Sequence, residues 1–144
     1  MEGIDNGRRL ALGIGAAYVL VGLLGFAVTG FDDFAGPTNE KLLGIFGLNP
    51  LHNVVHLLIG FGGLALWRRR ETAKAYGAAL VAGYGATFLF GLYASGRTDA
   101  VNFLSLNAAD NGLHLFSALA GVAILALVPK ATAAVTSERS RTTV

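Results

Sequence analysis

The chain has 144 residues, of which 53% are hydrophobic and 14% are charged, and its net charge at pH 7 is +2. An ordinary soluble domain carries about 25% charged residues, so this composition excludes a typical soluble globular protein. The absence of cysteine excludes disulfides, thiolate metal sites and thiol chemistry. The basic residues flank apolar runs, which argues against nucleic acid as a partner.

Four stretches contain no Asp, Glu, Lys or Arg, and each is long enough to cross a bilayer as a helix, which takes about 20 residues. We therefore predict an all-α integral membrane protein, a four-helix transmembrane bundle that fills residues 1–144 as a single domain. The charge-free stretches are residues 10–31, 42–67, 75–96 and 111–129. The predicted helices cover residues 10–30, 50–68, 74–96 and 108–129. The tail, residues 132–144, is rich in Thr, Ser and Arg and is predicted to be disordered.

Lys and Arg are unevenly divided between the two sides that four crossings define. Lys41 and Arg97 lie on one side, and the remaining nine of the 11 basic residues lie on the side of the termini. Cytoplasmic segments of membrane proteins carry the excess of Lys and Arg. The pattern therefore predicts a protein of the bacterial cytoplasmic (inner) membrane with both termini in the cytoplasm.

A ten-residue pattern, L-N-x-x-x-N-x-x-H-L, occurs at residues 48–57 and again at residues 106–115. The recurrence predicts two helical-hairpin repeats, residues 8–70 and 72–130. Both hairpins run in the same direction, so they are parallel repeats related by an axis along the membrane normal. The segments before each copy, residues 38–47 and 99–105, are too short to span and are predicted to be short interfacial helices in the outer loops.

The polar residues of each motif copy share one helix face, because residues three and four apart are neighbours on a helix. Asn49 before Pro50 is typical of a helix cap, as is Asn107. Asn53 and Asn111 lie one turn further in, where they are candidates for caps or for partners that orient neighbouring rings. Polar side chains in membrane segments usually face the bundle interior. One hypothesis is therefore a hydrogen-bonded His/Asn/Asp cluster near the outer face that joins the second and fourth helices.

Two further hypotheses make the motif a cofactor site. His52, His56, Asp110 and His114 provide three imidazoles and a carboxylate, a set that suits Zn²⁺ or non-haem Fe²⁺. Alternatively, His56 and His114 occupy equivalent positions and suit the two axial ligands of a b-type haem between facing helices. Three alternatives therefore remain for the cofactor: a divalent metal, haem b or no cofactor.

The serines offer no pattern for catalysis, because neither Ser105 nor Ser117 lies in a nucleophile elbow. The charge-free stretches contain no Lys, Arg or Glu with which a transporter would couple ion movement. We therefore expect a non-enzymatic interaction or accessory membrane protein, in contact with the lipid bilayer and with a homo-oligomeric or larger membrane complex as partner. The alternative is a small metalloprotein or cytochrome.

The stretch 43–57, followed by Gly60 and Gly63, resembles a family of small bacterial, largely actinobacterial, membrane proteins with four helices and unknown function. The residues that resemble its signature are Asn49, His52, Asn53, His56 and Leu57 in the first copy and Asp110, Asn111 and His114 in the second. The resemblance covers roughly residues 8–130. It implies the class and the topology and no particular chemistry.

Overall fold

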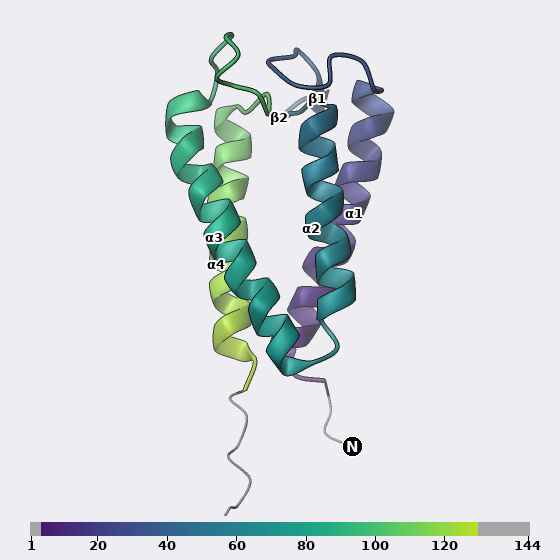
Figure 1. Ribbon diagram of the computed structural model, residues 1–144, viewed down its shortest axis with the longest axis vertical. Coiled ribbons are helices and arrows are strands. Elements are labelled where there is room, and N and C mark those ends of the chain that lie inside the picture. Colours follow the sequence, from purple (N-terminus) through teal and green to yellow (C-terminus); the bar gives the residue numbers. More distant parts are fainter. Residues whose placement is uncertain (1–3, 130–144) are drawn as a thin grey trace, which may run out of the picture.

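The computed structural model describes residues 4–129, and within that range four helices lie side by side in an up-and-down bundle (Figure 1). The helices are α1 (Asn6–Thr29), α2 (Pro50–Leu66), α3 (Arg70–Ala94) and α4 (Ala108–Leu127). Two short strands, β1 (Lys41–Leu42) and β2 (Phe46–Gly47), pair antiparallel between α1 and α2. The segment 132–144, predicted to be disordered, lies outside the described residues.

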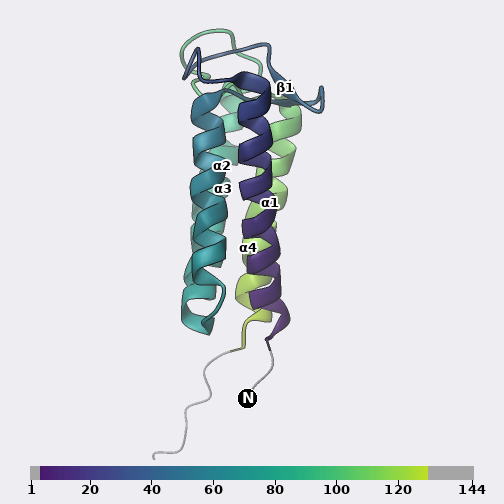
Figure 2. The same cartoon turned by 90° about the vertical axis from the view of Figure 1, so that its right-hand side faces the viewer.

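The bundle has two distinct ends (Figure 2). The loops 30–49 and 95–107 meet at one of them, which we call the loop end. The start of α1, the end of α4 and the turn between α2 and α3 lie at the opposite end, which we call the terminal end. The two motif copies begin α2 and α4, so both lie at the loop end.

The all-helical class is confirmed for the described residues. Three helices, α1, α3 and α4, are long and apolar enough to cross a membrane, with 24, 25 and 20 residues, whereas α2 is apolar but has 17. Large apolar side chains on every helix face outward, and Leu20, Leu58, Leu89 and Phe116 are each more than half exposed. Such a surface is costly in water, and it is compatible with contact between these helices and lipid.

Two of the helices begin earlier than the apolar pattern indicated. The first starts at Asn6 because the Asp5 side chain caps it, accepting a hydrogen bond from the Arg8 backbone amide at 2.9 Å. The third starts at Arg70, with Glu71 in its first turn. An acidic side chain stabilises the positive end of a helix. Polar first turns of this kind are not visible in a search for apolar runs.

The predicted interfacial helices are wrong, because residues 38–40 are irregular, residues 41–47 form the β1–β2 hairpin and residues 99–105 form turns. The turn of the hairpin contains Leu43 and Gly44, whose φ angles are 54° and 71°, in the left-handed region that a helix does not use. The two loops instead bond to each other. Gly36 N donates to the Phe103 carbonyl at 2.9 Å, which links loop 30–49 to loop 95–107.

Glycine allows close contact within each hairpin of helices. A Cβ atom added at Gly63 of α2 would lie 2.6 Å from the Cα atom of Gly15 in α1. One added at Gly121 of α4 would lie 2.6 Å from the carbonyl oxygen of Gly77 in α3. Lipid provides no hydrophobic drive for helix pairing, so close backbone packing of this kind is what stabilises it. Contacts within the α1–α2 and α3–α4 pairs are more extensive than contacts between the pairs.

At the terminal end, Asp5 joins the starts of α1 and α3. Its Oδ2 lies 2.8 Å from Arg8 Nε and 3.7 Å from Arg70 Nε. Burial alone would raise the pKa of the Asp5 carboxyl, but hydrogen bonds from the Arg8 amide and guanidinium outweigh it, so the pKa lies below the ordinary value. The carboxylate is therefore the form that stabilises the fold.

Replacement of Asp5 by asparagine is expected to keep the cap and lose the ion pairs. The free energy of unfolding at pH 7 should fall by roughly 0.2–1 kcal/mol. Because the folded pKa is lowered, this difference should be fully present above about pH 4 and disappear as pH falls through the folded pKa. Unfolding in detergent micelles, followed by circular dichroism at pH 7 and at low pH, measures it. A difference that is independent of pH would contradict the ion-pair explanation.

Candidate functional site: a buried histidine cluster

The two motif copies begin α2 and α4 with asparagine caps. The Asn49 side chain accepts a hydrogen bond from His52 N at 2.9 Å. The Asn107 side chain accepts from Ala109 N at 2.9 Å and from Asp110 N at 3.1 Å. Asp110 Oδ2 in turn accepts from Asn107 N at 2.9 Å, which completes a capping box. Helix initiation alone therefore accounts for these three polar side chains.

The same side chains fasten the loops to the bundle. Asp110 Oδ2 also accepts a hydrogen bond from Gly47 N at 3.0 Å, so the end of the β1–β2 hairpin is tied to α4. Asn49 Nδ2 donates to the Phe103 carbonyl at 2.7 Å, so the start of α2 is tied to loop 95–107. Each motif copy thus bonds to the loop that precedes the other copy.

The asparagines one turn further in point toward the partner helix of their own hairpin. Asn53 Nδ2 donates to Thr29 Oγ1 of α1 at 2.9 Å. A Cβ atom at Gly25 would lie only 2.0 Å from Asn53 Oδ1, and one at Gly91 of α3 would lie 2.1 Å from Asn111 Oδ1. A glycine on the neighbouring helix thus makes room for each amide. Neither contact involves a histidine, so the structure gives these asparagines a packing role.

All three histidines of the chain lie buried together at the loop-end half of the bundle, and we call His52, His56 and His114 the histidine cluster. Their exposed fractions are 3%, 6% and 3%. The His52 ring centroid lies 4.4 Å from that of His56 and 5.9 Å from that of His114. The Tyr18 ring packs at a tilt against His56, with centroids 5.3 Å apart, and Tyr84 stacks on His114 at 5.6 Å. Since the two tyrosine rings are 5.3 Å apart, the five rings form a closed circuit to which all four helices contribute.

The histidine cluster is only partly hydrogen-bonded within the protein, where His52 bonds the backbone of Leu104 and Gly47. The Nδ1 atom of each of its three imidazoles is buried and has no partner among the described residues. Buried polar groups nearly always have a partner, and an unsatisfied one costs about 1–3 kcal/mol. Such a group is normally paired with a protein atom, an ordered water or a ligand. The three Nδ1 atoms are therefore available to an ordered water or a ligand, as are the Tyr84 hydroxyl and the Oδ1 atoms of Asn53 and Asn111, which also have no partner among the described residues.

Two cavities adjoin the cluster, and all three histidines line both of them. Each has a volume of about 110 Å³. One lies beneath the β1–β2 hairpin, where Phe46 and Leu48 contribute to its wall. The other lies toward α3, where Gly83 and Thr87 contribute. Apolar side chains form most of both walls, so the imidazoles are the main polar groups that a bound molecule would meet.

The fold brings the predicted metal ligands, the three histidines and Asp110, near one another, but their side chains are not arranged to coordinate a metal ion. Among residues 4–129, no group of three or more His, Cys, Asp or Glu side chains is arranged to hold a metal ion. Asp110 lines the cavity beneath the β1–β2 hairpin together with the histidines, but its Oδ2 already accepts from Gly47 N and Asn107 N. A metal would require the three imidazoles to reorient toward one point, because Zn–N distances are about 2.0–2.1 Å.

Haem b does not fit between His56 and His114. The His52 ring packs against both of them, and the tyrosine rings close the circuit on the other side. The cavities of about 110 Å³ are far below the roughly 300–1,000 Å³ that even drug-sized ligands occupy. A macrocycle would need the rings of the circuit to move apart.

Tyr18 and Tyr84 belong to the site but were not predicted from the sequence. A signal for them exists, because Tyr18 stands 11 residues before Thr29 and Tyr84 stands 11 residues before Ser95. Thr29 and Ser95 are the third residues of two similar short segments, residues 27–30 and 93–96. Extending that weak similarity backward along α1 and α3 would have paired the two tyrosines as members of one site.

The fold and the site define an all-helical protein with three helices of membrane-spanning length and a buried histidine cluster near one end. The chain belongs to the family described as a domain of unknown function, DUF4383, which matches residues 8–127. Membership in an uncharacterised family is thus confirmed. No curated protein and no solved structure matches the chain.

Proposed function

We propose that this protein is a non-enzymatic accessory protein of a membrane, in which the histidine cluster binds a small, mainly apolar molecule through a hydroxyl group. The observation that carries the proposal is the set of three buried Nδ1 atoms that have no partner among residues 4–129. A neutral imidazole has one donor nitrogen and one acceptor nitrogen. A hydroxyl group both donates and accepts, so it is complementary to Nδ1 in either tautomer.

The cavity walls support a mainly apolar ligand. Val55, Ile59 and Leu104 line the cavity toward α3, and Leu48 and Leu113 line the cavity beneath the β1–β2 hairpin. Small-molecule sites are typically apolar with a few polar groups that fix orientation. An apolar cavity of about 150 Å³ is known to bind benzene, so cavities of about 110 Å³ suit a head group of similar or smaller size.

The serine hydroxyls favour a binding role over catalysis. Ser117 Oγ donates to the Leu113 carbonyl at 2.8 Å and is bonded to the Tyr18 hydroxyl. Ser105 Oγ lies 3.2 Å from Thr38 Oγ1. Both hydroxyls are thus engaged in structural bonds, whereas a nucleophilic serine needs a base within hydrogen-bond reach.

We further propose that the bundle spans the bacterial inner membrane with both termini in the cytoplasm, which places the histidine cluster toward the outer face. The distribution of Lys and Arg supports this orientation. The proposal also treats the two hairpins as parallel repeats. Equivalent positions support the repeat: Gly63 and Gly121, which are 58 residues apart like the two motif copies, each pack on the backbone of the partner helix, and a glycine of the partner helix makes room for the second asparagine of each motif copy.

The experiment that tests the binding function uses the fact that the chain has only three histidines, all in the cluster. Nitrogen NMR of protein labelled with [¹⁵N]histidine therefore reports on this site alone. Phenol should shift the Nδ1 resonances saturably, and anisole, its methyl ether without a donor, should bind about two- to tenfold more weakly, since one hydrogen bond contributes about 0.5–1.5 kcal/mol. Equal shifts with both probes, or none with either, would contradict the proposal.

A matched pair of variants assigns that binding to the cluster. His56→Ala removes one of the three imidazoles and should weaken phenol binding about tenfold. Leu58→Ala changes an exposed side chain of the same helix and should leave binding unchanged. Circular dichroism of both variants shows that the helices are retained.

The divalent-metal alternative keeps one observation in its favour, which is the presence of three neighbouring imidazoles without Nδ1 partners. Titration of the same labelled protein with Zn²⁺ separates the two candidates. If the ligand is a hydroxyl compound, we expect no stoichiometric complex between Zn²⁺ and the protein. One zinc ion per chain, with all three imidazoles shifted together and binding lost in His52→Ala, would replace the hydroxyl ligand by a metal.

A further inference from the structure

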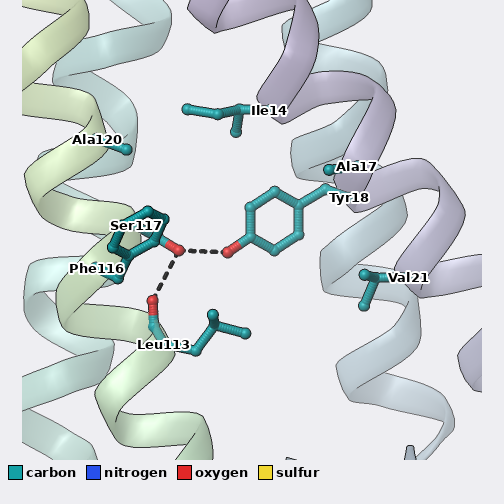
Figure 3. A pocket seen from close by; sticks show the side chains of 8 residues that line it. All are labelled: Ile14, Ala17, Tyr18, Val21, Leu113, Phe116, Ser117 and Ala120. Atoms are coloured by element: carbon teal, nitrogen blue, oxygen red, sulfur yellow. Dashed lines mark hydrogen bonds between the residues drawn. The ribbon is translucent and has the colours of Figure 1, made fainter. Parts of the chain in front are cut away.

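A groove of about 180 Å³ runs between α1 and α4, and its walls come from these two helices alone (Figure 3). Small side chains, Ala17 on α1 and Ala120 on α4, leave the space open. Phe116, which is 68% exposed, stands beside it. In a membrane this groove would face lipid, because it lies on the outer surface of two apolar helices.

The polar groups that Figure 3 shows in the groove are the hydroxyls of Tyr18 and Ser117, which are bonded to each other, and the Leu113 carbonyl, which accepts from Ser117. Ser117 Oγ uses its hydrogen to donate to the Leu113 carbonyl at 2.8 Å, so the Tyr18 hydroxyl is the donor of the bond between them. The groove therefore offers little to a polar group. Its shape and lining suit an apolar chain.

The groove and the histidine cluster are immediate neighbours. Val21 and Leu113 line both the groove and the cavity beneath the β1–β2 hairpin that the three histidines share. Tyr18 lines the groove and packs its ring against His56 at a centroid distance of 5.3 Å. The apolar groove between α1 and α4, which is open at the side of the bundle, thus adjoins the cavity that contains the unpaired Nδ1 atoms.

We infer that the ligand of this protein is a membrane amphiphile, with a hydroxyl-bearing head at the histidine cluster and an apolar chain in the α1–α4 groove. The ligand enters sideways from the lipid, past Val21 and Leu113. The inference rests on the proposed function, since the cluster supplies the head-group site. The apolar groove matches the chain of an amphiphile, and the cavity at the histidine cluster, with its polar nitrogens, matches the head group.

The test compares two probes that share a head group, phenol and 4-decylphenol, with affinities expressed per mole of detergent so that partition into micelles cancels. Lipid and detergent tails are as apolar as the groove, so the decyl chain need not raise the affinity of the probe for the protein. The experiment therefore measures how much a side chain that blocks the groove weakens binding of each probe. Ala17→Leu should weaken 4-decylphenol binding about tenfold and leave phenol binding unchanged, because only the chained probe needs that space.

The neighbouring residue supplies the control. Ala16→Leu adds the same side chain at an exposed position that does not line the groove, and it should affect neither probe. Ala120→Leu obstructs the groove from α4 and should reproduce the effect of Ala17→Leu.

The outcomes separate the two proposals. If phenol shifts the histidine resonances but neither Ala17→Leu nor Ala120→Leu weakens 4-decylphenol binding, the head-group site stands and the groove is not its extension. If 4-decylphenol binds equally well when His56 is replaced by alanine, the head does not lie at the cluster and the inference fails. If neither probe shifts the imidazoles, the proposed function fails as well.

Discussion

Alanine in place of Gly63 or Gly121 is expected to lower the free energy of unfolding by about 1–3 kcal/mol in each case. The added Cβ atom would lie 2.6 Å from Gly15 Cα or from the Gly77 carbonyl oxygen, respectively. Both neighbours are backbone atoms, so no side chain can rotate away and the two helices of the hairpin must separate. Unfolding of each variant in mixed micelles, followed by circular dichroism, measures the loss.

Gly13→Ala and Gly83→Ala are the matched controls, because a Cβ atom at either position would meet nothing within 4 Å. These variants should be as stable as the parent or up to about 1 kcal/mol more stable, given the higher helix propensity of alanine. If Gly63→Ala and Gly121→Ala behaved like these controls, the helices would not be in backbone contact. The two test variants should also resemble each other, since they occupy equivalent positions in the proposed repeat.

Asp110→Ala is the second change for which we expect a large effect. The substitution leaves Gly47 N and Asn107 N without their acceptor, at distances of 3.0 and 2.9 Å in the parent. Loss of a capping group and of a buried partner together should cost roughly 2–4 kcal/mol. Because Gly47 ends the β1–β2 hairpin above the histidine cluster, its amide should also exchange with deuterium faster. Denaturation and residue-resolved hydrogen exchange measure both effects.

An exposed carboxylate of the same loop region provides the control. Asp99 pairs with Arg97 at 2.6 Å, and that hydrogen bond holds the pKa of the Asp99 carboxyl below its ordinary value. Within the described part of the chain, however, the Asp99 side chain bonds only to its own loop. Asp99→Ala should change stability by no more than about 0.5 kcal/mol, as most surface substitutions do. A loss in Asp110→Ala no larger than that in Asp99→Ala would show that the tie to the hairpin is unimportant. Asp110→Asn, which keeps a carbonyl oxygen, should lie between the two.

The helical architecture could be predicted because its cause is local. Charge-free stretches of about 20 residues need every backbone group bonded within the segment, which only a helix achieves in lipid. The motif likewise identified where two helices begin, since Asn49 and Asn107 are residues that favour caps. The start of α1 was missed because Asp5 and the polar turn after it lie outside any apolar run. The membrane orientation and the repeat relation stay predictions.

The loops could not be predicted because their structure depends on distant partners. Residues 38–47 are moderately apolar, which suggested a helix, but Gly47 N bonds Asp110 and the Gly36 amide bonds Phe103. These bonds join residues 63 and 67 positions apart and replace the bonds that a helix would have made internally. Short-range sequence patterns contain no information about them.

The motif indicated which histidines form the candidate site, but it could not show whether their ring nitrogens have hydrogen-bond partners. Three imidazoles on facing helices are equally consistent with hydrogen-bonded partners, a metal or a haem. Whether Nδ1 of His56 meets a carbonyl, a ring or a cavity depends on side-chain packing from four helices. The same packing brings Tyr18 and Tyr84 into the site, although neither belongs to the motif.

The most direct measurement of the central claim is an experimental density map of the protein purified from its own membrane into lipid nanodiscs. We predict non-protein density within about 2.7–3.2 Å of the unpaired imidazole nitrogens, continuing past Val21 and Leu113 toward the groove between α1 and α4. Density of a single ion about 2.0 Å from three nitrogens would contradict the claim in favour of a metal. If the Nδ1 atoms were instead paired with carbonyls or hydroxyls of the protein itself, the claim would be contradicted in favour of a purely structural cluster.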